Sequence, residues 1–262
     1  LTTFYAYAPD CSPDGSKIAF GSNGEIWTIN SDGSGLTNIT GDGYTTSDTE
    51  PKWSPDGSKI LWQTGDSACL WVMNYNGSNK IQLSASVWWS CYAWNKTGSK
   101  IAFSNGQNIS TINPDGTGVQ QITNNSNPIF HTSSDFNDTG IVWSGDYEKI
   151  ACVRLFPLEY RLSIMNKDGS GKYDLVTSTS EINSVSFTPH TTKILYMKGY
   201  GIYTINTDGS NETFLTNGDD ADLVWSNNKT KIAYTTYTGN KQYLAIMNSD
   251  GTNDRRLTSG DM

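Results

Sequence analysis

The sequence predicts an all-β fold, a six-bladed β-propeller built of four-stranded antiparallel blades. A Lys-Ile pair recurs about every forty residues, a period typical of propeller blades and of helical repeats. The segments between Gly-containing turns are about five to eight residues long and rich in Ile, Val, Tyr, Trp and Thr, which favours strands over helices. The six pairs are Lys17-Ile18, Lys59-Ile60, Lys100-Ile101, Lys149-Ile150, Lys193-Ile194 and Lys231-Ile232.

The second copy shows the four strands that we expect in each blade, at residues 50–53, 59–63, 69–74 and 80–84. A Ser-Pro-Asp-Gly turn joins the first strand to the second, and an Asn-Gly turn joins the third to the fourth. Proline presets φ and glycine accepts a positive φ, so both turns can reverse the chain within a few residues. Each copy is therefore predicted to be an antiparallel meander.

An aromatic residue precedes most of the Lys-Ile pairs by six positions. A four-stranded sheet has two apolar faces, and it can bury them only by stacking between neighbouring blades. We therefore expect these aromatic residues and the isoleucines to form the core, with Cys11 at the aromatic position of the first copy. The aromatic residues are Trp53, Trp94, Trp143, Phe187 and Trp225.

No change in composition divides the chain, so residues 1–262 are predicted to form one propeller domain. The ring could close in two ways: residues 1–6 could add a strand to the last blade, or the first and last blades could pack together without it. The repeats are approximately 7–40, 48–84, 89–123, 138–176, 182–216 and 220–258.

The charge and composition exclude some classes of partner. The net charge is -8, with 26 acidic residues against 18 Lys and Arg, and phosphate binding depends on clustered Lys and Arg. No apolar run of about eighteen residues is present, which argues against insertion into a membrane. The abundance of Asn, Ser, Thr and Gly indicates an extracellular, periplasmic or cell-surface protein, and we expect a monomer.

The four cysteines lie at unrelated repeat positions without C-x-x-C spacing, which argues against a zinc or redox site. Cys11 and Cys152 are expected to be small buried hydrophobic residues. Cys69 and Cys91 lie at the edges of adjacent blades, where they could form a disulfide or remain reduced.

The repeat resembles that of TolB-like propellers. The resemblance rests on the string Pro-Lys-Trp-Ser-Pro-Asp-Gly-Ser-Lys-Ile at 51–60 and on the half-repeat Ile-Trp-Thr-Ile-Asn-x-Asp-Gly at 26–33, and it covers almost the whole chain. Similar repeats occur in periplasmic translocation proteins, peptidase gates, oligogalacturonate lyases and many surface proteins, so the resemblance implies the fold and not a function. The translocation protein carries an α/β domain before its propeller, which this sequence lacks, so a role in that complex is not expected.

Signs of an enzyme are few in the sequence. The G-x-S-x-G nucleophile motif of α/β-hydrolases is absent. A lyase or metal enzyme of this family would need several histidines near one site. The two that occur, His131 and His190, are expected on opposite faces of the propeller, so they cannot share a metal ion. We therefore expect no enzyme.

The connections between repeats vary in length, and variable loops on a constant scaffold are where binding residues concentrate. Some of these connections are expected on the face opposite the Ser-Pro-Asp-Gly turns. They contain Tyr5, Trp88-Trp89 and, within the insertion at 124–140, Phe136. A long loop is also expected at 153–160, between the second and third strands of the fourth copy.

Acidic residues gather just before the repeat aromatic position. Three interpretations are open: a solvated rim, a site for a cation such as Ca²⁺ with oxygen ligands, or a dock for a basic peptide. The residues are Asp48, Glu50, Asp138, Glu181, Asp219, Asp220 and Asp222.

These observations predict a non-enzymatic recognition module that binds a glycan or a peptide at the loop-rich channel mouth. No cofactor is predicted apart from that Ca²⁺. One alternative is a structural spacer domain of a larger surface protein. Another is a polysaccharide-acting enzyme that uses a carboxylate pair such as Glu50 and Asp222. The predicted contacts are Trp88, Trp89, Tyr5, Phe136, Glu50 and Asp222.

Overall fold

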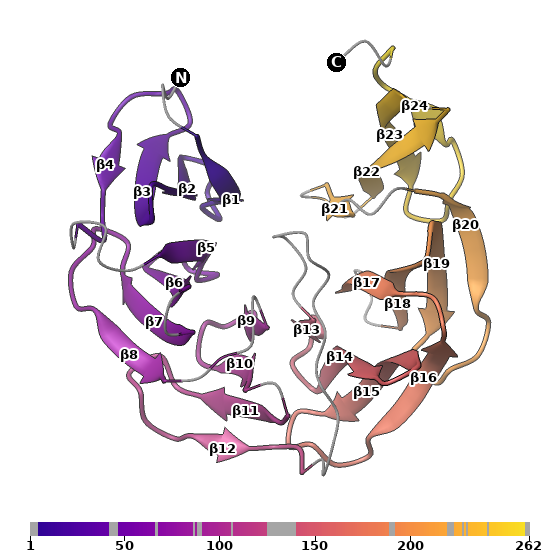
Figure 1. Ribbon diagram of the computed structural model, residues 1–262, viewed down its shortest axis with the longest axis horizontal. Coiled ribbons are helices and arrows are strands. Elements are labelled where there is room, and N and C mark those ends of the chain that lie inside the picture. The colour runs from indigo at the N-terminus through magenta and orange to yellow at the C-terminus, as the bar shows by residue number, and fades with distance from the viewer. Residues whose placement is uncertain are drawn as a thin grey trace. The chain divides into compact units, whose positions relative to one another are not determined.

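The computed structural model contains six four-stranded antiparallel sheets and no helix in the part of the chain that it describes (Figure 1). In each sheet the strands follow one another in chain order, so every blade is a meander. The predicted fold class, a β-propeller of six four-stranded blades, is confirmed. The described residues are 5–41, 47–65, 68–85, 87, 91–105, 107–124, 140–188, 192–218, 223–226, 228, 230–239 and 241–259.

The chain divides into two compact units, Leu1–Ser126 and Asn127–Met262. The first unit contains three blades. Their strands are β1 (Tyr7–Cys11), β2 (Lys17–Ser22), β3 (Glu25–Asn30) and β4 (Thr37–Asn38); β5 (Asp48–Trp53), β6 (Lys59–Thr64), β7 (Cys69–Asn74) and β8 (Ile81–Ser84); β9 (Tyr92–Trp94), β10 (Ile101–Ser104), β11 (Ile109–Ile112) and β12 (Gln120–Gln121).

The second unit contains the fourth, fifth and sixth blades. Their strands are β13 (Ile141–Trp143), β14 (Lys149–Phe156), β15 (Glu159–Asn166) and β16 (Tyr173–Ser178); β17 (Ile182–Phe187), β18 (Lys193–Lys198), β19 (Gly201–Asn206) and β20 (Thr213–Asn217); β21 (Val224–Trp225), β22 (Lys231–Thr238), β23 (Lys241–Asn248) and β24 (Arg255–Arg256).

The strands of the second blade lie within two residues of their predicted bounds. In the fourth blade, however, the loop predicted at 153–160 is wrong. There β14 and β15 stay paired as far as Phe156 and Glu159, and only two residues form the turn. Arg154 pairs with Arg161 in this ladder, so both residues belong to an extended hairpin.

The Ser-Pro-Asp-Gly-Ser-Lys turn is closed by its own side chains. In the second blade the Ser54 hydroxyl donates to Asp56 at 2.6 Å and accepts the backbone N–H of Lys59 at 2.9 Å. The Asp56 carboxylate also accepts the N–H of Ser58 at 3.0 Å, and Gly57 adopts φ 71°. These bonds lower the pKa of Asp56, chiefly through the Ser54 hydroxyl. The motif therefore specifies the turn locally.

A second recurring bond links the two halves of the repeat. The lysine that opens the second strand donates from Nζ to the asparagine that closes the third strand, for example Lys17 to Asn30 at 2.6 Å and Lys231 to Asn248 at 2.6 Å. The same asparagine donates from Nδ2 to a hydroxyl in the next turn, as Asn30 does to Ser34 at 3.0 Å. In the first, second, fourth and sixth blades the lysine–asparagine bond connects the Lys-Ile pair to the turn that follows the third strand.

The isoleucines of the repeat form the cores between blades, as predicted. From the second blade to the sixth the isoleucine of the Lys-Ile pair is fully buried. The repeat tryptophans tie consecutive first strands together: the indole N–H of Trp53 donates to the backbone oxygen of Asp10, and that of Trp94 to the backbone oxygen of Lys52, both at 3.1 Å. Trp53 is buried, whereas the other four repeat aromatics are half-buried.

The cysteine predictions are confirmed in part. Cys152 is buried as expected. Cys11 is exposed, so its predicted burial is wrong: it pairs with Ile18, which lines an open hollow on the first blade. None of the four cysteines forms a disulfide, and Cys69 and Cys91 are both buried.

Candidate functional site

Two of the six predicted contact residues, Tyr5 and Glu50, are described by the structure, and both lie in the first unit. The other predicted contacts and several residues that informed the prediction lie outside the described residues. These are Trp88, Trp89, Phe136 and Asp222, together with His131, His190, Asp138, Asp219 and Asp220.

The first strands of the first, second and fifth blades each contain a bulge where the ladder shifts register. The bulge contains a non-glycine residue with positive φ, namely Ala8 at 49°, Glu50 at 55° and Ser184 at 48°. All three lie three residues before the repeat aromatic position. A positive φ is uncommon in residues other than glycine, and a β-bulge changes the direction in which the nearby side chains point. Ala, Glu and Ser share no side-chain signal that would have revealed the bulge.

Tyrosines from two neighbouring blades contact the bulged strand β5. The Tyr92 hydroxyl, from β9, donates to the backbone oxygen of Glu50 at 2.6 Å. The Tyr7 hydroxyl, from β1, lies 3.4 Å from the backbone oxygen of Asp48, whose own N–H donates to Gly24 at 2.9 Å. We call Tyr5, Tyr7, Asp10, Asp48, Glu50 and Tyr92 the tyrosine–acid cluster; it joins the first strands of three blades.

Asp48 and Glu50 are buried, each only 1% exposed, whereas Glu181 is half-buried. Asp48 and Glu50 therefore do not belong to a solvated acidic rim, which was one interpretation of the acidic residues. No set of three His, Cys, Asp or Glu residues able to hold a metal ion occurs among the described residues.

The acidic surroundings alter the titration of the cluster. Burial raises the pKa of Tyr92 well above its usual value, and the charges of Glu50 and Asp10 raise it further. Burial also raises the pKa of Asp10, against the opposing effects of Lys52 and of the Trp53 N–H, which donates to its carboxylate at 2.6 Å. Burial likewise raises the pKa of Tyr7, so Tyr7 and Tyr92 are neutral donors near neutral pH, in a region of negative potential.

Tyr5 is the exposed member of the cluster, with 82% of its surface accessible. Its backbone oxygen accepts a hydrogen bond from the Ser22 hydroxyl at 2.7 Å, and its ring lies 6.3 Å from that of Tyr7. Tyr7 is the cross-strand partner of Gly21, and a Cβ on Gly21 would lie only 2.2 Å from the Tyr7 ring. The absence of a side chain at Gly21 thus leaves space for the Tyr7 ring. The exposed Tyr5 ring lies next to Tyr7, and the backbone of Tyr5 is held by Ser22.

The charged residues of the long hairpin in the second unit bind one another. Arg154 is buried and donates to Asp174 and to the Ser163 hydroxyl. Arg161 donates to Asp174 at 3.1 Å and lies 4.1 Å above the Phe156 ring. This network stabilises the hairpin and leaves Arg154 little surface for a ligand.

No family model matches the chain, and no curated protein matches it. Solved structures match it along nearly its whole length. The tricorn protease is 15% identical with a TM-score of 0.51, over 100% of this chain and 26% of the protease. A putative TolB from Agrobacterium tumefaciens is 15% identical with a TM-score of 0.59, over 98% of this chain and 82% of that one. Oligogalacturonate lyase from Vibrio parahaemolyticus is 10% identical with a TM-score of 0.73, over 97% and 77%.

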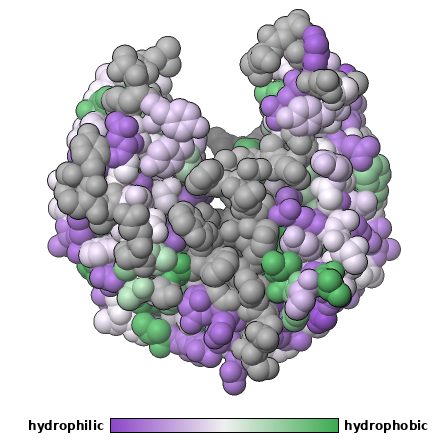
Figure 2. Space-filling view, in the orientation of Figure 1, coloured by the Kyte–Doolittle hydropathy of each residue, from purple (hydrophilic) through white to green (hydrophobic). Residues whose placement is uncertain are grey.

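At these identities the matches show the fold alone, and the fold is that of TolB-like propellers, as the repeat resemblance implied. The matched proteins include a protease and a lyase as well as TolB, so the architecture does not decide whether this chain is an enzyme. No helix among the described residues is long and apolar enough to cross a membrane. Among the coloured residues on the face shown in Figure 2, hydrophobic residues form small separate groups.

Proposed function

We propose that this chain is a non-enzymatic recognition module of a secreted or envelope protein. It binds a glycan or a peptide, as a monomer, at the end of the blades where the tyrosine–acid cluster lies. The observation that carries the proposal is the exposed Tyr5 ring, held on an anchored backbone 6.3 Å from the ring of Tyr7, whose hydroxyl lies 3.4 Å from the backbone oxygen of Asp48. The predicted contacts Trp88, Trp89, Phe136 and Asp222 belong to the same proposal.

Tyr5 supplies the apolar contact. A tyrosine offers a large flat surface and has few rotatable bonds, so it loses little conformational entropy when a ligand packs against it. The hydrogen bond from Ser22 to the Tyr5 backbone reduces that loss further. The ring can pack against the C–H face of a sugar or against an aliphatic side chain.

The charge of the cluster supports a basic peptide over a neutral glycan. Asp48 and Glu50 are buried in one strand, Asp10 lies in the neighbouring blade, and the whole chain carries a net charge of -8. Such a distribution attracts cationic partners over roughly the Debye length of about 10 Å at 0.1 M salt. Electrostatic attraction mainly increases the association rate.

The test is a binding screen of the purified chain against a glycan array and a panel of basic peptides, with and without Ca²⁺. We expect saturable binding that weakens about five- to tenfold in Tyr5→Ala and in the double variant Trp88→Ala/Trp89→Ala. Phe214→Ala is the control, because Phe214 is exposed on the outer strand β20 of the fifth blade.

Salt separates the two ligand classes. Raising the salt concentration from 0.05 to 0.5 M should weaken binding of a basic peptide several-fold and leave a neutral glycan almost unaffected. Failure to bind any ligand under every condition would support a structural spacer. Binding that survives both aromatic variants would place the site elsewhere.

A further inference from the structure

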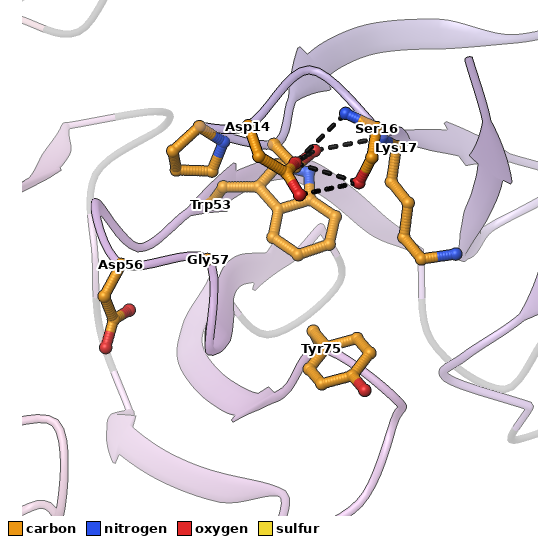
Figure 3. Close-up of a pocket in the computed structure, with 9 residues that line it drawn as sticks. Asp14, Ser16, Lys17, Trp53, Asp56, Gly57 and Tyr75 are labelled. Atoms are coloured by element: carbon orange, nitrogen blue, oxygen red, sulfur yellow. Dashed lines mark hydrogen bonds between the residues drawn. The ribbon is translucent and has the colours of Figure 1, made fainter.

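A hollow lies between the first and second blades, at the end formed by their Ser-Pro-Asp-Gly turns (Figure 3). In an antiparallel meander this is the end opposite Tyr5 and Tyr7. The hollow has a volume of about 330 Å³ and belongs entirely to the first unit. It is lined by Ser12, Pro13, Asp14, Ser16, Lys17, Trp53, Asp56, Gly57 and Tyr75.

Two successive turns form its rim. A Cβ placed on Gly57 would lie 3.6 Å from the Pro13 ring, so the second turn packs against the first at van der Waals distance. Gly98 stands in the same relation to Pro55 in the next pair of blades. Because each turn is also closed by its own hydrogen bonds, the rim is rigid before any ligand arrives.

Aromatic rings form two walls. Trp53 is 7% exposed, and the hydrogen bond from its indole N–H to Asp10 fixes the orientation of its ring. In Figure 3 the Trp53 ring lies between Asp14 and Tyr75. Tyr75 is 48% exposed.

Tyr75 departs from the repeat. It follows the asparagine that closes the third strand, a position where no other copy has an aromatic residue. The turn does not require one, because the backbone N–H at this position makes the same bond in copies without an aromatic residue: Tyr75 donates to Ser58 at 3.0 Å, and Ser31 donates to Ser16 at 2.9 Å. The other copies carry Ser31, Pro114, Lys167, Thr207 and Ser249.

The polar groups of the hollow are charged and held in place. The Ser12 hydroxyl and the N–H and hydroxyl of Ser16 lower the pKa of Asp14 to about 2, and similar bonds lower that of Asp56. Both carboxylates are therefore ionised at neutral pH. Among the described residues the Lys17 ammonium donates to Asn30 at 2.6 Å, and an ammonium group has three donors. The hollow is therefore lined by hydrogen-bond acceptors, by a donor and by the rings of Trp53 and Tyr75.

We propose that this hollow binds one neutral sugar ring of a glycan. A sugar ring has an apolar C–H face that packs against Tyr75 or Trp53, and hydroxyls that both donate and accept hydrogen bonds. A cationic group would meet the Lys17 ammonium, and an anionic sugar would meet the Asp14 and Asp56 carboxylates. The volume is at the lower limit of ligand pockets, which suits one ring.

This site is independent of the proposed function, which concerns the other end of the blades. Two variants that the repeat itself tolerates can test it. Tyr75→Ser installs the residue found at this position in the first and sixth copies. Asp14→Asn has a precedent in Asn228, which accepts the Ser226 hydroxyl at 2.8 Å in the equivalent turn.

The probes are methyl glycosides of glucose, galactose, mannose and N-acetylglucosamine, with methyl glucuronide and an N-acetylarginine amide as charged comparisons. Binding is measured by saturation-transfer NMR and calorimetry. We expect saturable binding of at least one neutral glycoside, weakened about tenfold in Tyr75→Ser and several-fold in Asp14→Asn. Tyr200→Ser is the matched control, since Tyr200 is 68% exposed in the fifth blade, outside this hollow.

Circular dichroism and thermal unfolding confirm that each variant folds. The proposal is overturned if no neutral glycoside saturates, if Tyr75→Ser binds as well as the parent chain, or if the arginine or glucuronide probe binds more tightly than every neutral glycoside. Because Tyr5→Ala leaves this hollow intact, it should bind the glycoside normally. The two proposals can therefore fail separately.

Discussion

Removing the hydroxyl of Tyr92 should destabilise the first unit measurably. Tyr92 is fully buried, and its hydroxyl donates to the backbone oxygen of Glu50 at 2.6 Å, at the bulge of β5. Tyr92→Phe keeps the ring and its packing but removes this donor from a buried acceptor. Such a loss costs about 1–3 kcal/mol of unfolding free energy. For a chain of this size a loss of about 2 kcal/mol lowers Tm by about 4–8 °C.

Thermal unfolding followed by circular dichroism, together with urea unfolding, measures this effect. Tyr5→Phe is the control, because Tyr5 is exposed and the same atom is removed from a residue that water already solvates. We expect the control to change the free energy of unfolding by less than about 0.5 kcal/mol. If Tyr92→Phe and Tyr5→Phe shift Tm equally, the hydrogen bond to the bulge contributes nothing to stability and the reasoning is wrong.

Three further predictions follow from burial, space and charge. Titration with a thiol reagent should modify one cysteine per native chain, the exposed Cys11, and four after unfolding; rapid reaction of a second thiol would contradict the burial of the others. Gly21→Ala should lower stability by several kcal/mol, because its Cβ would lie 2.2 Å from the Tyr7 ring, whereas Gly15→Ala, with φ 71° and no atom within 4 Å, should cost only about 1 kcal/mol. Burial raises the folded-state pKa of Asp10, so its protonated form stabilises the fold below the unfolded pKa and that stability is lost as pH rises. The change that Asp10→Asn makes to the free energy of unfolding, measured with urea, should accordingly be more stabilising at pH 7 than at pH 3. The opposite trend would refute the burial argument.

The turns were predictable because the bonds that form them are local. Ser54, Asp56 and Lys59 lie within six residues, and they close the turn without help from another blade. The strands between the turns follow from alternation and β-propensity, so their bounds in the second blade agreed with the structure within two residues.

The long hairpin of the fourth blade was missed for a physical reason. The loop predicted at 153–160 contains two charged residues, Arg154 and Glu159, and Arg161 follows it. In the structure they belong to paired strands, because Arg154 is buried against Asp174 and Arg161 bonds both Asp174 and Glu159. Ion pairs between residues far apart in the sequence leave no signal in local composition.

The sequence by itself determined the repeat, the four strands of each blade, their turns and the isoleucine cores, because each depends on contacts within a few residues or on the alternation of side chains. Tertiary structure alone decided the first-strand bulges. Glu50 was expected to face a ligand, yet it is buried at positive φ, where the Tyr92 hydroxyl from the next blade holds its backbone oxygen. At Glu50 a neighbouring blade thus stabilises a positive-φ backbone conformation, which Ala8 and Ser184 also adopt without sharing its side chain.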